Sequence, residues 1–228
     1  MTGKVRRHNE DAILVRDDLG LWVVADGMGG HSAGDYASAL IVDRLGALTR
    51  PASVYDFIES IEDALVQVNA DLLNTADERG VDIIGSTVVL LVHHSDFMLC
   101  GWVGDSRAYC MESGTLEQIS DDHVHGMKDD VTQFGGQPGP PPPGAGVLTR
   151  AIGAEEQLYV DWVVAGCRPG MQFVLCSDGV NKEMTDAEME VECRRQDSPQ
   201  DVLNSLLGVA LSRAARDNVS AVVVRLLD

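Results

Sequence analysis

The sequence predicts an α+β fold in which antiparallel sheets carry helices on their outer faces. Short apolar runs typical of strands occur near the start, in the middle and at the end of the chain. Two helical patterns follow the first pair of runs, and two more precede the last run. Because these elements do not alternate as βαβ units, a doubly wound parallel sheet is not expected. The 228 residues, 45% of them hydrophobic, are expected to form a single domain with a substantial core.

A β-hairpin is predicted at the start of the chain. Residues 12–15 and 21–25 are apolar runs, and Gly20 lies in the turn between them. Asp26 follows the second run directly, and three of the next four residues are glycine. Glycine adopts backbone conformations that other residues avoid, so the chain is expected to bend tightly after Asp26.

Four helices are predicted from two kinds of signal. Apolar side chains recur at helical spacing over residues 32–45 and from about residue 54 to residue 76. Capping-box signatures at residues 185–188 and 198–201 mark the starts of two later helices. The buried face of the last helix is expected to consist of Val202, Leu203, Leu206, Leu207 and Ala210.

The other apolar runs are predicted to be strands. Short polar turns join the first of them, and the run at 116–119 is expected to lie at a sheet edge. The predicted strands are residues 87–92, 97–103, 107–111, 116–119, 159–164, 172–176 and 220–227.

A polar excursion is predicted between about residues 120 and 147. Five of the eight prolines lie between Pro138 and Pro143, which predicts an extended surface loop inside the domain. Histidines and aspartates gather at its start, at His123, His125, Asp121, Asp122, Asp129 and Asp130. They could form a further metal site, but a solvated mobile loop is the preferred interpretation.

The charge balance limits the classes of partner. Lys and Arg number 17 and Asp and Glu number 36, which gives a net charge of -19. Such a surface repels the phosphate backbone, so nucleic acid is not expected as a partner. A small phosphorylated group remains possible, because bound metal ions reverse the local field.

The cysteines and the apolar stretches predict a soluble, cytoplasmic protein, with a monomer as the default state. Five cysteines without a Cys-x-x-Cys pair are typical of free thiols in a reducing compartment. The first residues lack the apolar core of a secretion signal, and no apolar stretch is long enough to span a bilayer.

Five acidic motifs spread along the chain predict one site for divalent cations. Four of them lie at the start or end of a strand-like run, where a packed sheet can hold them together. Carboxylates that meet repel one another unless a cation neutralises them. Hard oxygen ligands suit magnesium or manganese, so the predicted chemistry is metal-assisted hydrolysis of a phosphate ester. The motifs are Glu10-Asp11, Asp26-Gly27, Asp105 in Gly-Asp-Ser-Arg, Asp178-Gly179 and Asp217-Asn218.

Each motif alone has a structural interpretation, since Asp-Gly is first of all a turn dipeptide. Their joint order is more specific: RxxNED, DGMGGH, GST, GDSRAY, LTRAIG, CSDG and DN. This ordered set resembles the metal-dependent PPM/PP2C family of serine/threonine phosphatases in its compact bacterial form, over residues 3–227. The resemblance implies a central β-sandwich of two antiparallel sheets flanked by pairs of helices, in α/β/β/α layers.

The resemblance also implies two core metal ions, Mn²⁺ or Mg²⁺. Asp26 would bridge them, and Glu10 and the Gly27 carbonyl would bind one of the two. Asp178 and Asp217 would complete the ligands of the other.

Three further roles follow from the resemblance. Asp105, together with Asp178, would hold a possible third ion, and Asp11 would orient the attacking water. Arg6 would bind the substrate phosphate, because its guanidinium matches phosphate oxygens. A hydroxide bridging the two ions would attack phosphoserine or phosphothreonine in line. The expected partner is a phosphorylated protein, either a serine/threonine kinase or a target of one.

One position departs from the family pattern. Some members carry a histidine directly after the Asp-Gly pair, where it is proposed to act as the general acid, but here that position is Met28. His31 is close in sequence, yet it is expected to be a polar residue at a helix entrance.

Two other function classes agree less well with the sequence. A catalytically silent domain that binds phosphoproteins has no need of every acidic ligand, and here Glu10, Asp26, Asp178 and Asp217 are all present. A two-metal nuclease or phosphodiesterase would need a basic groove, which the strongly acidic composition does not favour. An active phosphatase is therefore the preferred hypothesis.

Overall fold

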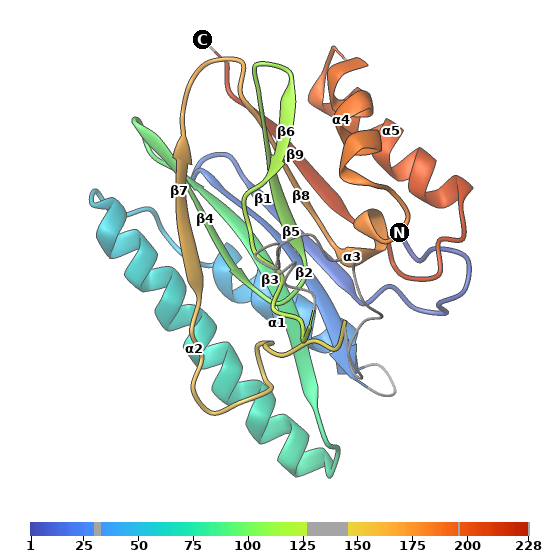
Figure 1. The fold of residues 1–228 in the computed structure, drawn as a ribbon. Helices are drawn as coiled ribbons and strands as arrows, with labels where there is room; N and C mark the ends of the chain where they lie inside the picture. Colours follow the sequence, from blue (N-terminus) through green and yellow to red (C-terminus); the bar gives the residue numbers. More distant parts are fainter. Residues whose placement is uncertain (30–32, 127–145, 196, 228) are drawn as a thin grey trace, which may run out of the picture.

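The computed structural model describes residues 1–29, 33–126, 146–195 and 197–227. Within these ranges the chain forms two antiparallel sheets and five helices (Figure 1). The five-stranded sheet, sheet A, has the order β1 (Asp11–Arg16), β2 (Leu21–Gly29), β3 (Ile84–His93), β4 (Phe97–Val103) and β7 (Asp161–Gly166). The four-stranded sheet, sheet B, has the order β6 (Thr115–Gln118), β5 (Arg107–Glu112), β8 (Gln172–Cys176) and β9 (Ala221–Arg225).

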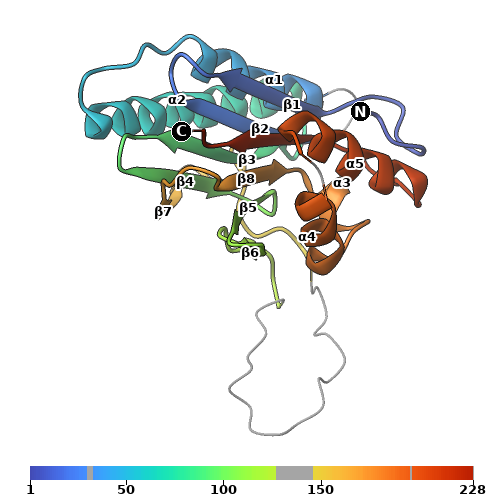
Figure 2. The same ribbon diagram turned by 90° about the horizontal axis from the view of Figure 1, so that it is seen from above.

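The helices form two outer layers, so the molecule has the predicted α/β/β/α arrangement. In Figure 2, α1 and α2 lie on the outer side of sheet A, and α3, α4 and α5 lie beside sheet B. The helices are α1 (Ala33–Gly46), α2 (Val54–Arg79), α3 (Asp178–Asn181), α4 (Asp186–Arg195) and α5 (Pro199–Ser212).

The sandwich has three cores, and strand β2 contributes side chains to two of them. Side chains alternate between the two faces of a strand. Leu21, Val23 and Ala25 pack with α1 and α2, whereas Trp22 and Val24 pack in the core between the two sheets. A third core lies between sheet B and its helices. Because both faces of the first part of β2 are buried, residues 21–25 are all apolar and do not alternate with polar residues.

The predicted turn and cap signals are confirmed. Gly20 has φ 58° in the β1–β2 hairpin. At α4 the Thr185 hydroxyl accepts from the Glu188 N–H at 3.3 Å, while the Glu188 carboxylate accepts from the Thr185 N–H at 2.9 Å. The Ser198 hydroxyl accepts from the Asp201 N–H at 3.1 Å at the start of α5. Strand β6 lies at the edge of sheet B, as expected.

Several boundaries differ from the sequence-based expectation. The tight bend predicted after Asp26 is wrong, because β2 continues to Gly29 and stays paired with β3. The single turn of α3 was not predicted, since four residues are too few to show helical periodicity. Strand β7 starts at Asp161, two residues after the predicted start, and β9 ends at Arg225, two residues before the predicted end.

Most of the predicted excursion, residues 127–145, lies outside the described residues, as do Asp129, Asp130 and the proline run. The ends that are described pair with each other: the His125 N–H donates to the Val147 carbonyl at 2.8 Å, and the Thr149 N–H donates to the His123 carbonyl at 2.7 Å. All five cysteines are free thiols, and Cys100 and Cys176 are buried in the core. Within the described ranges, no helix has the length and apolarity needed to cross a membrane.

Candidate active site

The predicted acidic residues meet at one end of the sandwich. Asp11 and Asp26 are direct partners across the β1–β2 ladder. Burial and the nearby carboxylates of Asp11, Asp178, Asp217 and Asp105 hold the pKa of Asp26 well above its usual range. These four neighbours come from segments far apart in the sequence. The structure therefore brings together the acidic residues that the motifs singled out.

Glu10 is held over a close contact between strand β2 and helix α1. A Cβ added at Gly27 would lie 1.9 Å from the Gly34 carbonyl oxygen, and one added at Gly34 would lie 2.7 Å from Glu10 Oε1. The Gly27 N–H donates to the Glu10 carbonyl at 3.0 Å. Gly27 is thus required by the approach of α1 to the strand. Burial raises the pKa of Glu10, and nearby carboxylates, including Asp35, add to the shift.

Within the described part of the chain, two buried carboxylate oxygens at this site have no hydrogen-bond partner. They are Oδ1 of Asp11 and Oδ1 of Asp178. The other oxygen of Asp11 accepts from the Ser177 hydroxyl at 2.9 Å, and the Ser177 hydroxyl in turn accepts from the Ser220 N–H at 3.2 Å. Buried polar atoms are normally paired, so unpaired anionic oxygens mark a place suited to a cation or a water molecule.

Asn218 ties the N-terminal segment to this end of the sandwich, a role that the motifs did not reveal. Its side-chain oxygen accepts from the Glu10 N–H at 2.7 Å, and its amide donates to the carbonyls of Thr2 and His8, both at 3.0 Å. Gly3, at φ 73°, lies so close to Asp217 that a Cβ there would be 2.2 Å from its carbonyl oxygen. Such long-range contacts help to fix the segment that carries Arg6 and Glu10.

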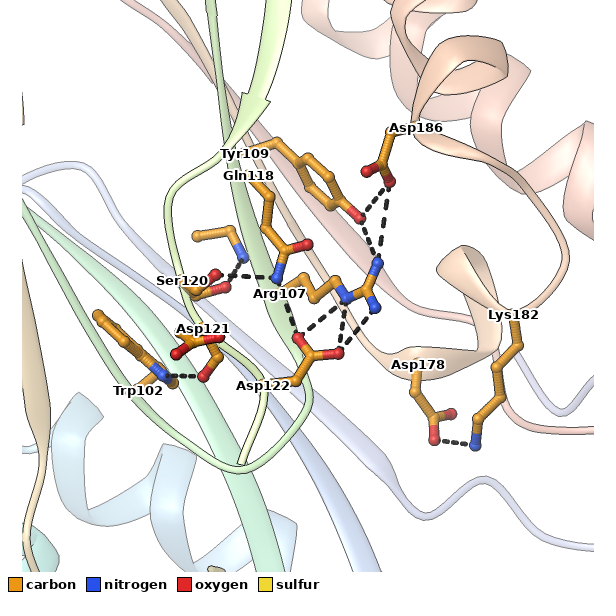
Figure 3. A network of polar contacts seen from close by, with 11 residues as sticks. Trp102, Arg107, Tyr109, Gln118, Ser120, Asp121, Asp122, Asp178, Lys182 and Asp186 are labelled. Carbon is orange, nitrogen blue, oxygen red and sulfur yellow. Dashed lines mark hydrogen bonds and ion pairs between the residues drawn. The ribbon is translucent and has the colours of Figure 1, made fainter. Parts of the chain in front are cut away.

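Two cationic side chains already pair with the acidic cluster. The guanidinium of Arg6 contacts both carboxylate oxygens of Asp217 at 2.9 Å and lies 3.7 Å from Glu10 Oε2. The ammonium of Lys182 pairs with Asp178 Oδ2 (Figure 3). Lys182 was missed from the sequence, although its spacing of four residues from Asp178 at the start of α3 was a usable signal.

Asp105 lies on the turn that follows β4. Gly104 has φ 113°, and the Thr87 and Ser106 hydroxyls bond to each other at 2.7 Å beneath the turn. Burial, together with the neighbouring Asp178, raises the pKa of Asp105 to about 6. Asp105 therefore belongs to the acidic cluster.

The start of the polar excursion has a different role from either expectation. His123 Nδ1 accepts from the Gly104 N–H at 3.0 Å, and its Nε2 lies 2.9 Å from Asp161 Oδ2 and 3.0 Å from Arg150 Nη1. Asp122 pairs with Arg107. The interpretation as a solvated loop is thus wrong for Asp122 and His123, since these side chains anchor the chain. In the described part of the excursion they form no metal-ligand cluster either.

The residue types at the acidic site fit hard divalent cations. They supply carboxylate and backbone carbonyl oxygens and two unpaired buried oxygens. Among the described residues, however, no three Asp, Glu, His or Cys side chains already converge closely enough to form a preformed ligand set. Since Asp217 and Asp178 pair with Arg6 and Lys182, binding of a cation would require these pairs to share or release their oxygens.

Comparison with known proteins identifies the family. The family model described as "Protein phosphatase 2C" matches residues 4–207, most of the chain. The chain belongs to the protein phosphatase 2C family. The expected family is thereby confirmed.

Relatives of this PP2C-family chain are named as serine/threonine phosphatases, which confirms the expected enzyme class. The serine/threonine phosphatase stp of Listeria welshimeri is 30% identical, with 97% of this chain and 92% of that protein covered. The serine/threonine protein phosphatase PstP of Mycobacterium tuberculosis is 27% identical over 99% of this chain and 44% of its own length.

Solved structures confirm the PP2C-like fold. PppA, described as a key regulatory component of T6SS in Pseudomonas aeruginosa, superposes with a TM-score of 0.89 and 41% identity, covering 99% of this chain and 94% of its own. The catalytic domain of PstP in complex with two manganese ions superposes with a TM-score of 0.85 and 25% identity, covering 100% of this chain and 96% of its own.

In this PP2C-family chain, Met28 lies within β2 opposite Gly85. A Cβ added at Gly85 would lie 3.0 Å from the Met28 methyl group, so Met28 packs tightly against the neighbouring strand. A thioether cannot donate a proton. His31 lies outside the described residues.

Proposed function

We propose that this protein is a metal-dependent phosphatase that hydrolyses phosphoserine and phosphothreonine in proteins. One observation carries the proposal. Four carboxylates from separate segments of the chain lie near Asp26, and burial, together with their charges, raises its pKa. Such a concentration of negative charge is costly in a folded protein unless it serves to bind cations. The PstP domain, which holds two manganese ions, supports manganese as the metal here.

The proposed ligands are the residues expected from the family resemblance. Asp26 would contribute to both core ions, Glu10 and the Gly27 carbonyl would bind one of them, and Asp178 and Asp217 would bind the other. Magnesium is the alternative metal.

Asp105 and Asp178 would hold a possible third ion. Divalent cations at such a site supply two things: a nucleophilic water near neutral pH and compensation of the phosphoryl charge.

The side chains of the protein have separate tasks in the proposed reaction. Asp11, fixed by the Ser177 hydroxyl, has one free oxygen that can accept a hydrogen bond from the attacking water. Arg6 is half exposed and can turn its guanidinium from Asp217 towards a substrate phosphate. No cysteine is needed as a nucleophile, and the buried Cys100 and Cys176 are held as thiols by their raised pKa values.

We further propose that the natural substrate is a phosphoprotein made by a serine/threonine kinase, or the kinase itself. The 41% identity to PppA, a regulatory component of T6SS, supports control of a secretion system as the setting. A single catalytic domain, a monomeric state, a cytoplasmic location and lack of nucleic-acid binding remain predictions.

Hydrolysis of p-nitrophenyl phosphate tests the proposal. We expect turnover with manganese or magnesium, none with chelator, and none for Asp178→Asn. Asp71→Asn is the matched control, because Asp71 is exposed on α2 and pairs only with Arg44 in the described contacts. A phosphothreonine peptide and a phosphotyrosine peptide of the same sequence then test the substrate class. Absence of turnover in folded, metal-loaded protein would favour the silent phosphoprotein-binding domain instead.

A further inference from the structure

Lys182 is a cation placed among the acidic residues without an assigned role. It caps the single turn of α3, where its N–H donates to the Asp178 carbonyl at 2.9 Å. Its ammonium pairs with Asp178 Oδ2, on the same side chain whose Oδ1 is buried and unpaired (Figure 3). The contact therefore holds one oxygen of Asp178 and leaves the other, buried oxygen without a hydrogen-bond partner among the described residues.

The charges around Lys182 extend beyond this pair. The carboxylates of Asp178, Asp105 and Asp217 all attract its ammonium electrostatically. Lysine is rare in this acidic chain: besides Lys182 only Lys4 and Lys128 occur. In the described structure Lys4 donates to the carbonyls of Ser212 and Arg213. Lys182 thus supplies a positive charge at the part of the molecule where negative charge is concentrated.

We propose that Lys182 is a positioning residue that acts as a built-in counterion of the metal ligands. It holds Asp178 in place and offsets part of the cluster's charge, and in doing so it weakens the binding of divalent cations. This inference rests on the proposed function, because it takes these carboxylates to be the metal ligands.

Removal of the Lys182 ammonium should have opposite effects on metal binding and on stability. Removing a fixed positive charge close to the ligands leaves a more negative site, which attracts divalent cations more strongly. In chelator the same removal leaves the carboxylates uncompensated, so the fold loses stability. A lysine that only packed or capped α3 would affect stability without strengthening metal binding.

The test compares Lys182→Met with Lys182→Arg in the full chain. Arg168→Met is the matched control: it removes one positive charge from an exposed pair with Glu112 between β7 and β8, away from the acidic cluster. Manganese binding is measured by titration calorimetry on chelator-stripped protein, and thermal unfolding is measured with and without manganese.

We expect Lys182→Met to bind manganese about tenfold more tightly than the wild type, with a smaller gain at high salt. Its melting temperature in chelator should fall, so that the stabilisation by manganese becomes larger. Lys182→Arg should retain wild-type values, and Arg168→Met should change neither quantity.

Unchanged or weaker manganese binding by Lys182→Met would overturn the counterion role while leaving the proposed function intact. A melting temperature in chelator that falls equally in Arg168→Met would do the same. Failure of the wild type itself to bind manganese would overturn the proposed function, and this inference with it.

Discussion

Two polar clusters meet at the turn after β4, and they differ in how their charges are satisfied. Arg107 donates to both oxygens of Asp122 at 2.7 to 3.0 Å and to the Tyr109 hydroxyl at 3.2 Å, and it lies 3.8 Å from Asp186 (Figure 3). Asp105 lies two residues earlier, and burial together with the nearby Asp178 carboxylate raises its pKa even though the Lys182 ammonium opposes the shift.

One cluster is compensated by opposite charges, whereas the other, for which we propose the catalytic role, is only partly compensated. The Arg107 network joins the start of the excursion, sheet B and the start of α4, and opposite charges hold it together. The pKa of Arg107 is raised although burial acts against it, because Asp122 and Tyr109 accept its hydrogen bonds. The acidic cluster instead keeps unpaired oxygens and repelling charges. A fold retains such a cost where its function requires it.

The largest effect is expected for Asp26→Asn. Activity with manganese should fall about a thousandfold or more, because the substitution removes the carboxylate at the centre of the cluster. In chelator the variant should be at least as stable as the wild type, since it relieves repulsion. Steady-state hydrolysis of p-nitrophenyl phosphate and thermal unfolding check both parts. Full turnover by a folded Asp26→Asn protein would refute the assignment of this cluster as the catalytic centre.

Arg107→Met should show the opposite profile. Loss of the guanidinium leaves the largely buried Asp122 without its cationic partner, with only the Gln118 amide among the described residues still donating to it at 3.0 Å, so the free energy of unfolding should fall by about 2–3 kcal/mol. Turnover per folded molecule should change by less than about tenfold, since Arg107 contacts none of the proposed ligands. Urea denaturation followed by assays on the folded fraction measures both. The exposed pair at Arg168 gives the control, for which Arg168→Met should cost less than about 1 kcal/mol. A fall of more than about tenfold in turnover per folded molecule would show that Arg107 also contributes to catalysis, so that the two clusters act as one functional unit.

The acidic cluster should also make the stability of the protein depend on pH. The pKa of Asp105 is about 6 in the folded protein against an ordinary value of 3.8. Between these values the folded protein keeps a proton that the unfolded chain has lost, so stability in chelator should fall as pH rises through this window. The contribution of this one group is on the order of 1 kcal/mol after solvent screening. Unfolding measured from pH 4 to pH 7 tests the sign, and Asp105→Asn should flatten the dependence. A rise in stability over this range would contradict it.

The smallest effects are expected for two matched variants, each of which loses a single hydroxyl group from one of the two clusters. Ser177→Ala removes the donor to Asp11, and kcat should fall about tenfold because the carboxylate loses its orientation. Tyr109→Phe removes a hydroxyl that donates to Asp186 at 3.0 Å, which should cost about 1 kcal/mol of stability and leave kcat unchanged. Equal effects of the two variants on kcat would remove the distinction between the clusters.

Local signals in the sequence predicted most of the elements. The capping boxes at Thr185 and Ser198 involve neighbours within three residues, so their contacts were predictable. The bend predicted after Asp26 was wrong because β3 holds β2 extended, and only the approach of Gly34 explains the glycine at position 27. The short α3 was missed because its four residues carry too little periodicity.

The sequence by itself determined the family, because its carboxylates occur in an ordered set of motifs, and it supplied the candidate residues that we propose as metal ligands. Tertiary structure alone decided how these groups are held. Asn218 bonds to Thr2, 216 residues away, and Arg107 reaches both Asp122 and Asp186. It also decided which oxygens of Asp11 and Asp178 remain free. The reason is physical: caps and periodicity depend on neighbours in the chain, whereas charge compensation depends on distances that exist only after the sheets have packed.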